Sequence, residues 1–103
     1  MVDDKGLWVV TFGSNELYRL EDGKKVDVKT LPKGSLDGIV KDANGHFVIA
    51  SWEGQEVMRG LAEGPFATVI ANAKAPADIG YDTKRKRLLV PRFQDDIVQI
   101  VGM

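Results

Sequence analysis

The chain of 103 residues contains no cysteine. This absence excludes disulfide bonds, thiolate catalysis and zinc sites built on cysteine. A single histidine, His46, makes a serine triad a poor explanation, and no glycine-rich phosphate loop occurs. What remains as a candidate for chemistry is one pair, Asp37-Gly38, at the head of an expected strand.

Charge of one sign is also missing, because 14 basic residues are offset by 15 acidic ones. A net charge of -1 gives no electrostatic reason to expect a nucleic acid or an anionic membrane as partner. The N-terminus, Met1 to Lys5, carries acid where a signal peptide needs base. The apolar run Leu7 to Val10 is far too short to span a bilayer. We expect a soluble chain without a signal peptide, a transmembrane segment, or a nucleic-acid or membrane partner, and the compartment stays open.

Helical patterns are absent too. The 11 glycines are spread through the chain and would interrupt most helical windows. The one alanine-rich stretch, Ala71 to Ala77, contains Pro76 and lacks helical periodicity. The sequence therefore predicts an all-β fold.

An internal repeat organises the chain. Three apolar segments that each close on an aromatic residue align with one another: Leu7 to Phe12, Phe47 to Trp52 and Leu88 to Phe93. The aromatics are 40 and 41 residues apart, and an aliphatic follows each of them by five residues (Leu17, Val57 and Val98). A repeat of about 40 residues built from short strands is typical of propeller blades.

Within each repeat, apolar and alternating runs are separated by turn residues. The Asn44-Gly45 pair between two apolar runs predicts a hairpin, and Lys25 to Leu31 begins with the alternation of a strand with one wet face. We expect ten short strands forming a partial β-propeller of about two and a half four-stranded antiparallel blades. Residues 1–103 are expected to form one domain, with repeats at approximately 6–35, 36–76 and 77–101.

Such a partial propeller would be an open arc. Its two terminal blades would expose faces that a closed ring buries, and its sheet edges would carry unpaired backbone groups. Self-association through a head-to-tail contact is the natural remedy. The sequence therefore predicts a homo-oligomer that forms through the open blade faces.

Three stretches carry a resemblance to a known family, namely Ser35 to Trp52, Pro76 to Asp82 and Leu88 to Phe93. They resemble the late blades of the SMP-30/gluconolactonase/LRE-like proteins. The resemblance implies a six-bladed propeller with one divalent cation on its axis and with lactone hydrolysis as its activity.

Within that family, a Pro-Asp-Gly motif at the head of an inner strand supplies an aspartate that binds the metal and acts as a base. Asp37-Gly38 matches this motif, with Leu36 in place of the proline. The resemblance thus implies that Asp37 is both the catalytic residue and a ligand of Ca²⁺ or Zn²⁺. The other metal ligands of the family, a glutamate and two asparagines, come from earlier blades that this chain does not contain.

Asp78 and Trp52 are further candidates, for binding a small lactone or a sugar-like ligand. Asp37 and Asp78 are 41 residues apart at the heads of inner strands, so both could face a common axis. The alternative is that each aspartate caps a loop, and that Trp52 packs between blades as Phe12 and Phe93 would. Two functions follow: a metal-dependent lactone hydrolase, or a non-catalytic propeller module that self-associates.

Overall fold

The strands pair into three antiparallel sheets in the computed structural model, which describes residues 1–62, 64–71, 79–92 and 97–102. The first sheet contains β1 (Val2–Asp3), β2 (Gly6–Val10), β3 (Glu16–Glu21) and β4 (Lys24–Thr30). The second contains β5 (Leu36–Lys41), β6 (Phe47–Ser51), β7 (Glu56–Gly60) and β8 (Phe66–Ile70). The third contains β9 (Gly80–Asp82), β10 (Arg87–Arg92) and β11 (Ile97–Gly102). No described residue lies in a helix, which confirms the all-β prediction.

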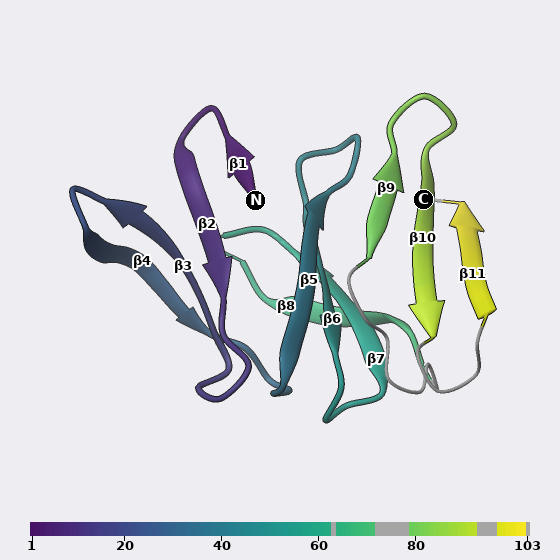
Figure 1. Ribbon diagram of the computed structural model, residues 1–103, viewed down its shortest axis with the longest axis horizontal. Helices are drawn as coiled ribbons and strands as arrows, with labels where there is room; N and C mark the ends of the chain where they lie inside the picture. The colour runs from purple at the N-terminus through teal and green to yellow at the C-terminus, as the bar shows by residue number, and fades with distance from the viewer. Residues whose placement is uncertain (63, 72–78, 93–96, 103) are drawn as a thin grey trace.

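The sheets follow one another in chain order, and within each sheet the strands do the same (Figure 1). The three sheets meet near the middle of the molecule, where β5 of the second sheet contacts both β2 of the first and β9 of the third. This is the arrangement of a partial propeller. Across the described ranges, no helix has the length and apolar character needed to cross a membrane.

One strand was not expected from the sequence. The described residues form eleven strands in place of ten, and the additional one is β1, which pairs Val2 with Leu7 and Asp3 with Gly6. A two-residue strand has no periodicity of its own, so only its pairing with β2 defines it. It gives the first sheet four strands, whereas the third sheet has three.

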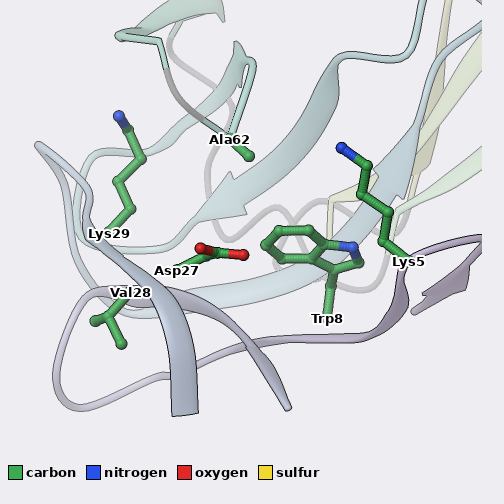
Figure 2. A pocket seen from close by; sticks show the side chains of 6 residues that line it. All are labelled: Lys5, Trp8, Asp27, Val28, Lys29 and Ala62. Atoms are coloured by element: carbon green, nitrogen blue, oxygen red, sulfur yellow. The ribbon is translucent and has the colours of Figure 1, made fainter. Parts of the chain in front are cut away.

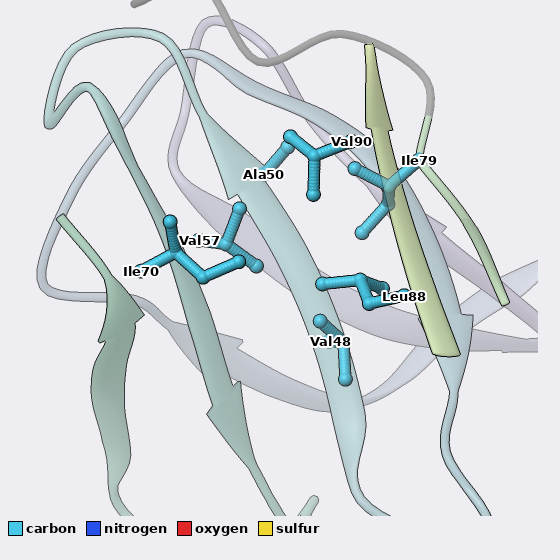
Figure 3. Close-up of a cluster of buried hydrophobic side chains, with 7 residues drawn as sticks. All are labelled: Val48, Ala50, Val57, Ile70, Ile79, Leu88 and Val90. Atoms are coloured by element: carbon cyan, nitrogen blue, oxygen red, sulfur yellow. The ribbon is translucent and has the colours of Figure 1, made fainter. Parts of the chain in front are cut away.

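The second sheet is buried on both of its faces. Phe47, Ile49 and Met58 belong to a cluster that packs against the first sheet. Val48 and Val57 belong to a second cluster, which packs against the third sheet (Figure 3). Successive residues of a strand point to opposite faces, so the uninterrupted apolar run of β6 supplies both clusters. Each fully buried side chain of this size contributes about 1.5–3 kcal/mol to folding.

The first and third sheets are each buried on one face only. Trp8 and Leu17 of the first sheet, and Leu88 and Val90 of the third, are buried against the second sheet. The opposite faces expose large apolar side chains: Val2 and Leu7 on the first sheet, Val98 and Ile100 on the third. The terminal sheets therefore each have an uncovered apolar face.

The chain crosses from the first to the second sheet through a tightly packed glycine. A Cβ atom at Gly34 would collide with the side chains of Asn15 and Glu53, so no larger residue fits without a rearrangement. The buried Ser51 hydroxyl donates a hydrogen bond of 2.6 Å to the Gly34 carbonyl oxygen. The crossing leads directly into β5, in which Asp37 is the second residue.

Candidate functional site

Asp37 is the second residue of β5 and pairs with Ala50 of β6. Ala50 belongs to the apolar cluster between the second and third sheets, so Asp37 lies on the face that is turned toward β9. The strand bulges immediately after it, where Gly38 has a φ of +75°. Glycine adopts this left-handed conformation without the steric cost that other residues meet.

The Asp37 carboxylate is half-buried and has no hydrogen bond or ion pair to any residue that the structure describes. In this it differs from Asp3 and Asp42, which both carry ion pairs. A carboxylate without a partner can accept a proton or bind a cation. The geometry therefore keeps Asp37 as a candidate for chemistry.

Trp52 lies at the same end of the second sheet. It follows β6, and its backbone N–H donates to the Ser35 carbonyl oxygen at 3.0 Å, two residues before Asp37. Its ring meets the Phe12 ring edge-on, with centroids 6.3 Å apart and planes at 70°. Phe12 follows β2 of the first sheet, so this contact is the packing between sheets that the repeat predicts. A role for Trp52 in substrate binding stays a prediction.

The other predicted partner of Asp37 is Asp78. It lies outside the residues that the structure describes, as does Phe93. The predicted pairing of two carboxylates at the heads of inner strands therefore stays a prediction.

Asp42 follows the C-terminal end of β5, and both of its carboxylate oxygens accept hydrogen bonds. The side chain of Asp42 is 1% exposed, and its Oδ2 accepts a hydrogen bond of 2.6 Å from Arg59 Nε on β7. Its Oδ1 accepts the backbone N–H groups of Asn44 and His46 at 2.9 and 3.1 Å. Together these bonds close the β5–β6 turn and tie it to β7. Sequence reasoning recognised this turn but missed the ion pair, because Arg59 is 17 residues away.

Two opposing effects act on the pKa of Asp42. Burial raises the pKa, whereas the hydrogen bonds from the His46 backbone and from Arg59 lower it. The hydrogen bonds prevail, and the pKa lies below its ordinary value of 3.8. Asp42 is therefore an ionised structural group at neutral pH.

Asp3 joins the first sheet to the second in a similar way. Its Oδ2 accepts hydrogen bonds from Lys41 Nζ at 2.5 Å and from Trp8 Nε1 at 2.9 Å. Burial raises its pKa, but the bond from Lys41 and other hydrogen bonds lower it further, so the pKa lies below 3.8. Lys41 also lies over the Phe47 ring, with Nζ 5.0 Å from the centroid. The unexpected strand β1 is thus held in place by an ion pair to the end of β5.

A groove of about 440 Å³ opens beside the first sheet (Figure 2). It is lined by Lys5, Trp8, Asp27, Val28, Lys29 and Ala62. Asp27 is held by Arg19, whose Nη2 lies 3.2 Å from its Oδ2, and Trp8 is almost fully buried. Asp37 and Trp52 are not among the lining residues, so the groove and the predicted site are different places.

A divalent cation needs several oxygen ligands, and Zn²⁺ usually takes three or four protein ligands. In the described ranges, no group of three histidine, aspartate or glutamate side chains could hold a metal ion. Asp37 alone does not make a Ca²⁺ or Zn²⁺ site, and the described histidine, aspartate and glutamate side chains form no cluster around it. Comparison of the chain with protein-family models, with curated proteins and with solved structures finds no match.

Proposed function

We propose that this chain belongs to a lactone hydrolase of the SMP-30/gluconolactonase type, in which Asp37 is the catalytic base. The observation that carries the proposal is the state of Asp37. It lies half-buried on β5, the strand where the three sheets meet, and its carboxylate has no partner among the described residues. A half-buried carboxylate without a structural partner is available for proton transfer.

Hydrolysis of a lactone needs a base near the attacking water. The Asp37 carboxylate accepts a proton from water while the water oxygen bonds to the lactone carbonyl carbon. The ring C–O bond then breaks, and the proton passes to the departing ring oxygen, which yields a hydroxy acid. Trp52, at the same end of the sheet, offers an apolar surface to the ring of the substrate.

A Ca²⁺ or Zn²⁺ ion remains part of this proposal, with Asp37 as one ligand. The further ligands would have to come from residues other than the described groups, which form no metal cluster on their own. The reaction as written uses only Asp37 and water.

The test is the hydrolysis of a simple aldonolactone, corrected for the uncatalysed rate, with Ca²⁺, with Zn²⁺ and with neither. Asp37→Asn keeps the size of the side chain but removes the base, and we expect a loss of about 100-fold or more in kcat. Asp4→Asn, at an exposed site, is the matched control and should keep the full rate. A wild-type rate equal to the uncatalysed rate would reject the proposal, as would an Asp37→Asn variant with full activity.

A second function is a non-catalytic propeller module whose property is self-association. The observation that favours it is the pair of uncovered apolar faces on the terminal sheets. Light scattering tests it directly, because a stable monomer at all concentrations would contradict it.

A further inference from the structure

The internal repeat assigns an equivalent position to one residue in each sheet. Leu17, Val57 and Val98 are such equivalents, spaced by 40 and 41 residues. Leu17 is fully buried against the second sheet, and Val57 is fully buried against the third. Val98 of the third sheet is 60% exposed. The third sheet thus presents to solvent the same position that the first two sheets bury against the next sheet along the chain.

Equivalent positions on the opposite face of the sheets show the same pattern of burial within the chain and exposure at its end. Leu7, Phe47 and Leu88 are equivalents in the repeat. Phe47 is buried against the first sheet and Leu88 against the second, whereas Leu7 is 41% exposed. The first sheet therefore presents to solvent the position that the other two bury against the preceding sheet.

Strand register identifies the neighbours of these residues. Leu7 pairs with Val2 and Leu20, and Val9 with Tyr18, so the five side chains share what we call the leading face: Val2, Leu7, Val9, Tyr18 and Leu20. Leu89 pairs with Ile100, two residues from Val98, and the three form the trailing face. Both faces continue the packing surfaces that already join sheet to sheet within the chain.

We propose that the trailing face of one copy docks on the leading face of a second copy, and that two copies close a ring. The partner is a second copy because the chain itself holds both halves of the sheet-to-sheet interface, and neither half is covered by another described residue range of the chain. Contact between two different faces is heterologous, and it must close to avoid a filament. This inference deepens the second of the two functions above and is independent of lactone hydrolysis.

The number of copies follows from the number of sheets. One chain has three sheets, so two copies supply six and three copies supply nine. Propellers typically have 4–8 blades. A ring of two copies is within this range and a ring of three is outside it.

The charges at one end of the molecule agree with this docking. The β9–β10 turn of the third sheet is basic, with Lys84, Lys86 and Arg85, the last of which pairs with Asp82. In the first sheet the β3–β4 turn carries Asp22, and the β1–β2 turn carries Asp4 beside Lys5. All three turns lie at the same end of the molecule (Figure 1). Docking of the trailing face on the leading face brings opposite charges together at this end, as Asp3 and Lys41 already meet between the first and second sheets.

The experiment is sedimentation equilibrium of the full chain over a range of concentrations. The expected mass is twice the chain mass of 11.3 kDa. Val98→Lys on the trailing face and Leu7→Lys on the leading face should each give a folded monomer, since a buried lysine without a partner is costly. Val69→Lys is the control, because Val69 is an exposed valine on β8, outside both faces, and it should leave the dimer intact.

A mixture of the two monomeric variants distinguishes a head-to-tail contact from a symmetric one. The Val98→Lys chain keeps an intact leading face, and the Leu7→Lys chain keeps an intact trailing face. One undamaged interface can therefore form between them, and we expect the mixture to regain a dimer that neither variant forms alone. Circular dichroism checks the fold of each variant, and Ile100→Lys replaces Val98→Lys if that chain does not fold.

Three results would overturn the proposal. A wild-type monomer at every concentration would show that no second copy docks, which leaves lactone hydrolysis to be judged by its own assay. A mass above that of two chains would reject the six-sheet ring. Monomeric variants that do not recover a dimer on mixing would show that the contact is not head-to-tail.

Discussion

Asp37 lies at the start of β5 and Asp42 directly follows its end, and the two carboxylates differ in their hydrogen bonding. Asp42 accepts hydrogen bonds from Arg59 and from the backbone N–H groups of Asn44 and His46. Asp37 has no hydrogen bond or ion pair to a described residue. An aspartate thus closes a turn at the end of the strand, whereas the aspartate at its start has no hydrogen bond to a described residue.

The difference separates a structural carboxylate from one that has no structural partner among the described residues. At Asp42, the ionised form is stabilised by hydrogen bonds from Arg59 and from the backbone, so the group holds the β5–β6 turn and stays ionised near neutral pH. At Asp37, the strand conformation is set by the backbone of Gly38 and not by the carboxylate. Substitutions at the two ends should therefore have different consequences for folding.

The largest effect is expected from Asp42→Asn. The change removes the charge that pairs with Arg59, and a partly buried guanidinium loses its partner. We expect the free energy of unfolding to fall by about 2–3 kcal/mol, because breaking a buried ion pair from one side is costly. Urea denaturation followed by tryptophan fluorescence measures it.

Asp37→Asn is the matched control for that measurement. It makes the same change of side chain near the start of β5 but breaks no interaction with a described residue, so we expect a change of no more than about 0.5 kcal/mol. Equal losses at the two positions would contradict the distinction between the two carboxylates.

Acid should reveal the contribution of Asp42 without a mutation. Its pKa is lowered in the folded state, so the unfolded chain binds more protons between the two pKa values. The stabilisation is present above the ordinary value of 3.8 and is lost as the pH falls through the lower folded value. Asp3, whose pKa is also lowered, acts in the same direction.

Denaturation curves at pH 7 and near pH 3 test this linkage. The difference in unfolding free energy between the wild type and Asp42→Asn should shrink at the lower pH, because below 3.8 the unfolded wild-type chain takes up the proton more readily than the folded chain. A difference that stays constant would mean that the charge of Asp42 does not stabilise the fold.

The sequence predicted the sheets well because strand alternation and the 40-residue repeat are properties of neighbouring residues. It missed β1, since Val2–Asp3 is defined only by pairing with β2 and by the Lys41 ion pair. It also missed the irregularity in β4, where Asp27 has a φ of +52° within a run that reads as regular alternation. β1 is too short to show a strand period of its own, and no residue pattern in β4 marks the irregularity at Asp27.

The candidate site was predictable only in part. The position of Asp37 at the head of an inner strand followed from the repeat, and β5 does lie between β2 and β9. The ion pair of Asp42 with Arg59 did not follow, because it depends on the order in which β5, β6 and β7 are paired. The sequence therefore indicated the position of Asp37 but not the ion pair of Asp42 with Arg59.

An effect smaller than that of Asp42→Asn is expected from Gly38→Ala, which sharpens the comparison. A side chain at a φ of +75° is strained, and we expect a loss of about 1 kcal/mol in unfolding free energy. Gly13→Ala is the control, because Gly13 lacks a positive φ and a Cβ there would meet no atom within 4 Å. If Gly38→Ala were as harmless as Gly13→Ala, the bulge would not need glycine. If it destabilises the chain while Asp37→Asn does not, the start of β5 depends on its backbone and leaves the Asp37 carboxylate free for chemistry.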